Sequence, residues 1–336
     1  MIKAGIINVT GYAGVGLARL LHQHPQVELI SVTGRSLAGQ KLAEVFPHLA
    51  DIDMIIEAEP GDVDVALSAL PHGTSAAALL PLIKKGIKVI DLSGDFRLKD
   101  VAVYEQWYGV KHPAPELLGE AVYGLPELNR EQITKSKLVA NPGCYPTSAI
   151  LALAPAVKNS LIEPDIIIDS KSGLSGAGRT LSLTLHYSEI NESVSAYSLD
   201  GHKHMPEMAQ ALSANGKEPA VVFIPHLVPM TRGILSTCYG KLSKDVSKDQ
   251  IVKLYKDFYK EAPFTKVVDV PPQTKQTWGS NNCLIYPTVD ARTNRLIVIS
   301  CIDNLVKGAA GQAVQNMNLV LGVPETTGLN SLAVYP

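Results

Sequence analysis

The sequence lacks the charge asymmetry and the long apolar runs that mark chains binding nucleic acid or membranes. Its 30 lysines and arginines are balanced by 32 aspartates and glutamates, and they form no basic run or tail. Nucleic acid and an anionic membrane are therefore not expected partners. No apolar run approaches membrane-spanning length, and Met1–Ile7 turns into glycines too soon to be a secretion signal.

Cysteine is also scarce. Its four positions are far apart and form no CxxC pair, which argues against a zinc site and against a disulfide scaffold. We therefore expect no metal and a reducing cytoplasm. The 336 residues, 46% hydrophobic and 18% charged, are typical of a globular chain with two domains.

The pattern of strand and helix signals changes near Pro155. Before it, short apolar strands alternate with helical segments, which predicts a parallel sheet with crossover helices. After it, strands follow one another with fewer helices between them, which predicts an α+β domain on a largely antiparallel sheet. The expected strands are 6–9, 27–32, 63–67, 88–91, 138–139, 166–169, 220–224, 234–242, 284–286 and 296–302. Ser247–Gln250 is a candidate capping box for a helix reaching about Tyr259.

A glycine-containing loop follows the first expected strand. Gly11 would allow close approach of a pyrophosphate, and Gly14 would allow close helix packing. Asn8 replaces the usual earlier glycine and can adopt left-handed geometry. A purely structural turn is the alternative, but the position before an alternating pattern favours a Rossmann-type dinucleotide-binding domain.

The end of the second strand indicates which dinucleotide binds. NAD sites place an acid there, whereas NADP sites place a cation for the 2′-phosphate. This chain has Thr33-Gly34-Arg35-Ser36 and no acid nearby in sequence. Arg35 and Ser36 therefore predict NADP; an ordinary solvated arginine is the alternative.

Cys144 stands at a Pro-Gly turn between a buried strand and an apolar helical pattern. A cysteine at a helix N-terminus is stabilised as its nucleophilic thiolate by the helix dipole and by unpaired N–H groups. The same N–H groups can stabilise an oxyanion on a carbonyl that the sulfur attacks. Beside a nicotinamide, such a cysteine implies a thioester route. A buried structural cysteine is the alternative.

Together the motifs of this chain resemble those of the N-acetyl-γ-glutamyl-phosphate reductases of arginine biosynthesis, within the semialdehyde dehydrogenase superfamily. The resemblance covers nearly the whole chain and departs mildly at Asn8, Lys203 and Ser148. The matching segments are Thr10–Gly14, Pro71–Gly73, Asp91–Leu98, Tyr123–Glu127, Asn141–Thr147, Ser175–Arg179, Pro225–Pro229, Arg232–Ile234 and Asp303–Gly311.

The resemblance implies NADPH-dependent reductive dephosphorylation of an acyl phosphate, with Cys144 as nucleophile. His202 and His204 are the acid–base candidates. We expect the His202–His204 segment before Pro206 to be extended, with only one of its two rings facing Cys144. We favour His202, and a structural role for His204 at the following helix.

The resemblance also implies the remaining site residues. The cofactor set is Thr10, Gly11, Tyr12, Ala13, Gly14, Arg35, Ser36, Pro71, His72, Ser175, Gly176 and Asn304. Arg97, Arg179 and Glu207 form the substrate set, since arginine suits oxyanions. Either arginine could instead form a structural ion pair, and Asn304 could cap the last helix. The implied domains are 1–143 with 303–336, for NADP, and 144–302, for catalysis and assembly into a homodimer or homotetramer.

Three competing functions remain. The related lysine-biosynthesis reductase acts on a carrier-protein-bound aminoadipyl phosphate, but the chain shows no basic patch for an acidic carrier. Aspartate-semialdehyde dehydrogenase is disfavoured because Ile234 stands where that family has a histidine. A non-catalytic NADP-binding sensor is disfavoured by Cys144 and the histidine pair.

Overall fold

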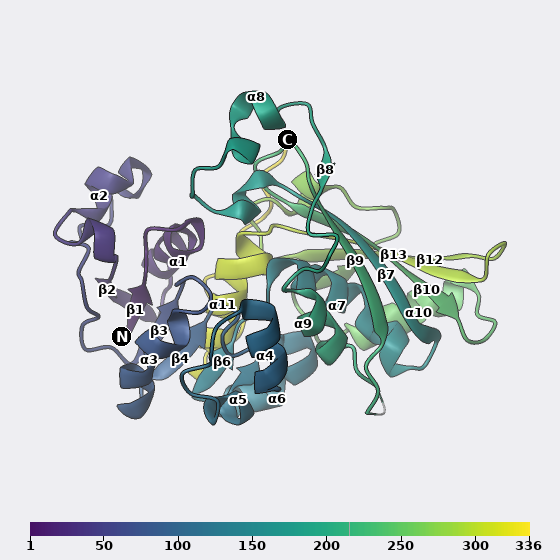
Figure 1. Ribbon diagram of the computed structural model, residues 1–336, viewed down its shortest axis with the longest axis horizontal. Coiled ribbons are helices and arrows are strands. Elements are labelled where there is room, and N and C mark those ends of the chain that lie inside the picture. Colours follow the sequence, from purple (N-terminus) through teal and green to yellow (C-terminus); the bar gives the residue numbers. More distant parts are fainter. Residues whose placement is uncertain (215) are drawn as a thin grey trace. The chain divides into compact units, whose positions relative to one another are not determined.

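The computed structural model describes residues 1–214 and 216–336, which form two compact units. The first comprises Met1–Gly143 and Ala309–Asn330, and the second comprises Cys144–Gly308 and Ser331–Pro336 (Figure 1). Residues 303–308 and 331–336, which the sequence grouped with the first domain, thus group with the second. Among the described residues, no helix is long and apolar enough to cross a membrane.

The first unit is built on a six-stranded sheet in which every pair is parallel. The strand order is β2-β1-β3-β4-β6-β5. The strands are β1 (Ile2–Ile7), β2 (Val27–Val32), β3 (Val65–Ser68), β4 (Lys88–Asp91), β5 (Val122–Tyr123) and β6 (Leu138–Ala140). The helices are α1 (Tyr12–His22), α2 (Leu42–Val45), α3 (Ser75–Lys84), α4 (Val101–Tyr108), α5 (Leu117–Glu120), α6 (Pro126–Lys135) and α11 (Gly311–Val320). The predicted Rossmann-type sheet is confirmed.

Burial of apolar side chains on both faces of this sheet explains its continuous hydrophobic strands. Helix α3 places Ala76, Leu79 and Leu82 against Ala66 and Val89 in one core cluster. Burying each such leucine stabilises the fold by roughly 1.5–3 kcal/mol. The carboxyl ends of the strands are thereby fixed as the edge from which the loops project.

The second unit is built on a seven-stranded sheet of order β11-β12-β13-β10-β7-β9-β8. Only the pairs β7·β9 and β11·β12 are parallel, so the predicted largely antiparallel sheet is confirmed. The strands are β7 (Ile162–Ser172), β8 (Ser195–Ala196), β9 (Ala220–Leu227), β10 (Ile234–Leu242), β11 (Thr265–Val267), β12 (Cys283–Asp290) and β13 (Arg295–Ile302). The helices are α7 (Cys144–Lys158), α8 (Tyr187–Ile190), α9 (Met205–Ala211) and α10 (Lys248–Phe258).

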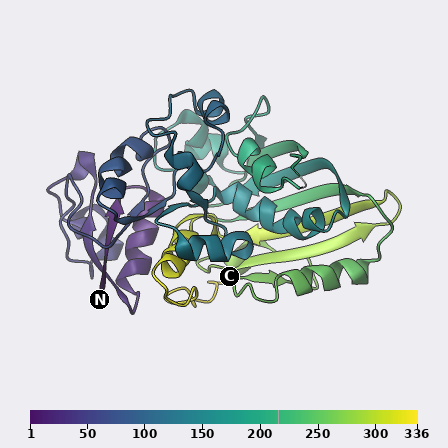
Figure 2. The same ribbon diagram turned by 90° about the horizontal axis from the view of Figure 1, so that it is seen from below.

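Helices α7, α9 and α10 cover one face of this sheet, since α7 contacts both other helices and four of the strands (Figure 2 shows α7 and α10 along the strands). Burial therefore alternates along β10: Ser236 and Cys238 are buried, whereas Leu235, Thr237 and Tyr239 are half-exposed on the opposite face. The expected capping box of α10 is present, with Ser247 and Gln250 bonded reciprocally.

Candidate active site

The turn from β1 into α1 has the geometry of a dinucleotide-binding loop. Asn8 adopts left-handed backbone geometry, with φ 68°, as expected for the residue replacing a glycine. A Cβ on Gly14 would lie 2.4 Å from the carbonyl oxygen of Asn8, so only glycine lets α1 pack so closely. A Cβ on Gly11 would meet nothing within 4 Å, which leaves room in front of the helix N-terminus for a ligand.

The side chain of Asn8 ties this turn to the neighbouring strands. Its amide nitrogen donates to the Ala69 carbonyl at 3.0 Å, and its oxygen accepts from the Thr10 hydroxyl at 2.8 Å. Its backbone N–H donates to the Thr33 hydroxyl at 3.1 Å. The loop is thus held at the carboxyl ends of β1, β2 and β3, where open α/β sheets bind their ligands.

A cavity of about 250 Å³ opens beside this turn. It is lined by Ile7, Asn8, Thr33, Gly34, Arg35, Ser36, Ala58, Glu59, Pro60, Leu70, Pro71, Ala78 and Leu82. Three predicted cofactor residues, Arg35, Ser36 and Pro71, are among them. Within the part of the chain that the structure describes, the residues of the Thr10–Gly14 loop do not line this cavity. Its largely apolar wall suits a planar base, with polar groups at one end.

The cavity contains an acid that the sequence analysis missed. Glu59 lies 24 positions beyond Arg35 in the chain but lines the same cavity. A parallel bridge between Thr33 and Glu57 brings the two segments together. The expectation of no acid near Arg35 considered only residues adjacent in sequence to the second strand. It is wrong for the folded chain, in which Glu59 lines the same cavity as Arg35.

Two polar motifs of the first unit hold backbone rather than project into the cavity. The Asp95 carboxylate accepts the N–H groups of Gly73 and Ala76, at 2.7 and 3.0 Å, and so caps α3. His72 accepts the Gly94 N–H on Nδ1 at 2.7 Å, and its ring packs against Tyr108.

Arg97, predicted to bind substrate, is only 3% exposed. Its Nε donates to the Asn141 carbonyl at 2.8 Å and its Nη2 to the Leu92 carbonyl at 2.6 Å. These bonds clamp the segment that leads to Cys144. These bonds to backbone carbonyls favour the structural role over substrate binding.

Cys144 is the first residue of α7 and is partly exposed. Gly308 passes so close that a Cβ on it would lie 2.8 Å from the Cys144 Cβ, so this position accepts only glycine without a shift. The helix that follows is buried over nearly its whole length, from Tyr145 to Ala156. The sulfur thus stands at the one partly accessible end of a buried helix, where N–H groups and the helix dipole favour a thiolate.

A chain of buried serines ties α7 to the sheet. One turn after Cys144, the Ser148 hydroxyl donates to the Ser236 Oγ at 3.0 Å, and the Ser236 and Ser170 oxygens are 2.7 Å apart. Ser300 donates to the Ser148 carbonyl at 2.9 Å. All four are fully buried, so these bonds fix the register of an otherwise apolar helix on β7, β10 and β13.

The two histidines join an aromatic cluster next to Cys144. The ring centroids of His202 and His204 are 4.8 Å apart. Both rings contact the Tyr145 ring, with centroid distances of 5.8 Å for His202 and 6.0 Å for His204. Tyr197 and Phe223 complete the cluster around His202. Residues 203–204 form a turn rather than the expected extended segment, and both rings contact Tyr145, the residue next to Cys144.

His202 is held in one tautomer. Its Nδ1 accepts the His204 backbone N–H at 3.1 Å, so the neutral ring carries its proton on Nε2. Burial, with a smaller contribution from the charge of Lys203, lowers the pKa of His202 to about 4. His202 is therefore neutral at physiological pH and presents an N–H donor.

Two tyrosine hydroxyls lie within the field of the cysteine. The Tyr197 hydroxyl donates to that of Tyr145 at 3.1 Å. Burial, with a smaller contribution from the charge of Cys144, raises the pKa of both tyrosines, that of Tyr197 to about 12. Both hydroxyls thus stay protonated, and they form a short relay, because the Tyr145 hydroxyl in turn donates to the His226 carbonyl at 3.4 Å.

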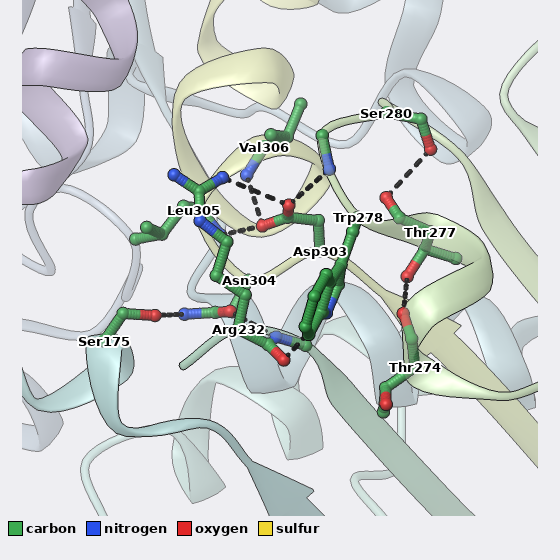
Figure 3. Close-up of polar contacts among 12 residues, drawn as sticks. Ser175, Arg232, Thr274, Thr277, Trp278, Ser280, Asp303, Asn304, Leu305 and Val306 are labelled. Carbon is green, nitrogen blue, oxygen red and sulfur yellow. Dashed lines mark hydrogen bonds and ion pairs between the residues drawn. The ribbon is translucent and has the colours of Figure 1, made fainter. Parts of the chain in front are cut away.

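Asn304 is buried in a network at the end of β13 (Figure 3). Its oxygen accepts the Gly233 N–H at 2.8 Å and its nitrogen donates to Ser175 at 2.9 Å. The alternative role of Asn304 as a helix cap is wrong, since Asp303 accepts the N–H groups of Leu305 and Val306. A π-helical turn (Val306–Ala310) follows, then α11.

Arg232 is a candidate anion ligand that the sequence analysis matched to a motif without giving it a role. Its Nη1 lies 3.4 Å from the buried Asp303 carboxylate, while 39% of its side chain stays exposed (Figure 3). Trp278 donates to its backbone carbonyl at 3.0 Å. An arginine oriented by a buried acid and open on its other side suits an oxyanion, and its Arg-Gly turn after β9 is the sequence signal.

The remaining predicted residues of the second unit differ in exposure. Arg179 and Gly176 are exposed, in the segment after β7. Glu207, in the first turn of α9, is buried, as is Ser175. Ser175, Gly176 and Asn304, predicted to bind cofactor, belong to the unit that carries Cys144 rather than to the unit with the cavity.

The other three cysteines are buried thiols. Burial raises the pKa of Cys238, and that of Cys301 to about 12, so neither forms a thiolate near neutral pH. In residues 1–214 and 216–336, no group of three or more His, Cys, Asp or Glu side chains is arranged to hold a metal.

Two family models match the chain. The semialdehyde dehydrogenase NAD binding domain matches residues 3–136, and the semialdehyde dehydrogenase dimerisation domain matches residues 144–304. The first unit is thus a nicotinamide-dinucleotide-binding domain, and the junction of the two matches lies just before Cys144.

Relatives of known name match over their whole length. The chain is 60% identical to the N-acetyl-gamma-glutamyl-phosphate reductase of Dehalococcoides mccartyi, with 99% of each chain covered, and 50% identical to that of Heliobacterium modesticaldum, with 100% of each covered.

Among solved structures, aspartate semialdehyde dehydrogenase II of Vibrio cholerae has a TM-score of 0.69 at 18% identity, covering 96% of this chain and 99% of its own. The Candida albicans enzyme with NADP has a TM-score of 0.71 at 17% identity, with the same coverage. At this identity the likeness concerns the fold alone.

Proposed function

This chain belongs to the N-acetyl-gamma-glutamyl-phosphate reductase family, and from that premise we propose that it reduces N-acetyl-γ-glutamyl phosphate to N-acetylglutamate semialdehyde with NADPH. The observation that carries the proposal is Cys144 at the start of a buried helix, beside a cluster in which neutral His202 presents an Nε2–H donor. Such a site suits a covalent acyl intermediate whose carbonyl oxygen gains negative charge.

The first half of the reaction is the work of Cys144. Its Sγ attacks the acyl carbon, the carbon–oxygen bond to phosphate breaks, and phosphate leaves with the electron pair, which forms a thioester. NADPH, when bound, supplies the hydride for the thioester carbonyl. The carbon–sulfur bond then breaks, its electrons return to Sγ, and the semialdehyde is released.

We assign His202 the position facing the reacting oxygen. Its Nε2–H stabilises the developing oxyanion, since Nδ1 is bonded to the backbone and the ring is neutral. The Tyr145 ring contacts the His202 ring edge-on, and the His204 ring contacts it at a tilt. Arg232 and Arg179 bind the negatively charged groups of the substrate. Glu207, buried in the first turn of α9, orients the His202–His204 segment that precedes this helix.

We further propose NADP as the cofactor. Asn8, Gly11 and Gly14 give the pyrophosphate a close backbone approach, and the apolar cavity beside them takes the adenosine. Arg35 and Ser36 supply a cation and a hydroxyl for the 2′-phosphate. Ser175, Gly176 and Asn304 are proposed for the nicotinamide end.

The chain is proposed to act in the cytoplasm as a homodimer or homotetramer. The sheet face opposite α7 carries apolar side chains that no helix of the described chain covers, among them Ile167 and Val222, which are 36% and 49% exposed. A second copy would bury them, and a measured molar mass of one chain in solution would contradict this.

The reverse reaction tests the proposal. Enzyme given N-acetylglutamate semialdehyde, phosphate and NADP⁺ should form NADPH only when all three are present. Aspartate semialdehyde and a carrier-bound aminoadipate semialdehyde serve as comparison substrates. Faster turnover of either comparison substrate, or no phosphate dependence, would overturn the assignment.

A further inference from the structure

The cavity beside the Asn8–Gly14 turn, proposed above for the adenosine, is lined by two charged side chains, one of each sign. Arg35 and Glu59 line it together with neutral residues only. A cavity selective for the 2′-phosphate of NADP needs positive charge, whereas one that binds NAD places a carboxylate on the ribose hydroxyls. This cavity contains the recognition element of both.

A backbone bridge brings together the two segments that carry these side chains. Thr33 pairs with Glu57 in a parallel bridge, and the Gly34 N–H donates to the Glu57 carbonyl at 3.0 Å. Two residues further along each segment are Arg35 and Glu59. Both residues line the cavity, Arg35 as the first residue of a short 3-10 helix (Arg35–Leu37) and Glu59 in a bend just beyond the bridge.

Glu59 rather than Glu57 is available to a ligand. The Glu57 carboxylate accepts the Ser31 hydroxyl at 3.1 Å, a bond that holds its segment to β2. Glu59 and Arg35 are both exposed, and Pro60 follows Glu59 in the cavity wall. Their side chains are therefore free to turn toward the ribose.

We propose that Glu59 is a second specificity determinant of this cavity: its carboxylate accepts the 2′-hydroxyl of NAD and repels the 2′-phosphate of NADP, so that both cofactors bind. The inference rests on the proposed dinucleotide site. Removing the charge of Glu59 should strengthen NADP and weaken NAD, each by about threefold to tenfold, as expected for one charge interaction near the surface.

The experiment measures dissociation constants of NADP and NAD for the full chain, Glu59→Gln and the control Glu44→Gln, an exposed acid of α2 outside the cavity. Adenosine 2′,5′-bisphosphate and adenosine 5′-monophosphate repeat the comparison without the nicotinamide. Glu59→Gln should raise the preference for the 2′-phosphorylated member of each pair, less so at high salt, and Glu44→Gln should not.

The same comparison in an Arg35→Ala background separates direct repulsion from pairing between the two side chains. A retained effect of Glu59→Gln supports the proposal, whereas its loss would show that Glu59 acts only on Arg35 and would overturn it. An unchanged preference in Glu59→Gln also overturns it. A wild-type chain that binds neither dinucleotide would instead refute the proposed cofactor site itself.

Discussion

The two units build their sites in different ways. In the dinucleotide unit, recognition depends on backbone: the left-handed Asn8, the open space at Gly11 and the close packing at Gly14. In the Cys144 unit it depends on side chains from distant segments, such as Tyr145, Tyr197 and Phe223. A backbone site is set by one local turn, whereas a side-chain site exists only when the whole sheet has the correct register.

The difference predicts where each unit tolerates change. The dinucleotide site should lose affinity in graded steps, because several backbone groups share the ligand. The cysteine site should lose turnover abruptly, because in the proposed mechanism one sulfur forms the bond and the His202 ring faces the reacting oxygen. Four substitutions, in order of decreasing expected effect, test this contrast.

Cys144→Ser should lower turnover at least about a thousandfold, because a hydroxyl is a far weaker nucleophile than a thiolate. NADP affinity and the unfolding midpoint should stay as in the wild type, since the substitution is small and lies in the other unit. Steady-state rates and cofactor titration measure both. Turnover above about a hundredth of the wild-type rate would contradict covalent catalysis.

His202→Asn should lower the maximal rate about a hundredfold with little change in KM, since it removes a donor to the oxyanion. His204→Asn, the matched comparison, should act mainly on KM or stability. The opposite pattern would transfer the oxyanion role to His204.

The His202→Asn variant also tests how pH affects the stability of the fold. The pKa of His202 is about 4 in the fold and about 6.5 when unfolded. Between these values the unfolded chain binds the extra proton, so stability should fall as the pH falls from about 6.5 to 4. Urea unfolding of His202→Asn should show a smaller loss over this range than the wild type; an equal loss would argue against the lowered pKa.

Arg35→Ala should weaken NADP by roughly 1.5–3 kcal/mol, the usual value of a charged hydrogen bond. NAD should be weakened much less, because it has no 2′-phosphate. Dissociation constants for both cofactors decide the matter. Equal losses would show that Arg35 does not contact the phosphate.

Ser148→Ala should lower the free energy of unfolding by about 1–2 kcal/mol, since Ser236 loses a buried partner while the bond of Ser300 to the carbonyl persists. The control Ser331→Ala removes an exposed hydroxyl and should change little. Denaturant titration measures both. A loss no larger than that of the control would show that the serine chain does not hold α7.

The sequence could predict the features that depend on one local segment, but not those that depend on contacts between distant segments. The Asn8–Gly14 turn and the cysteine at a helix start were predictable, because strand, turn and helix signals are local. Glu59 was missed because it lies 24 residues from Arg35 in the chain and reaches the cavity through the bridge between Thr33 and Glu57. The turn at His204 was missed because φ and ψ at that position depend on packing against Tyr145.

The roles of arginines were the least predictable. Arg97 and Arg232 both lie in turns or bends between regular elements, yet Arg97 is clamped between carbonyls and Arg232 is partly open beside Asp303. Only burial separates them, and burial is a property of the folded sheet rather than of the motif.

The burial of Cys238, Cys283 and Cys301 leaves the native protein with a single addressable thiol. A mild alkylating reagent should therefore modify each folded chain once, at Cys144, and the mass increase would count functional molecules in a preparation. Unfolding would expose three further sulfurs, so the same reagent becomes a reporter of folded and unfolded populations.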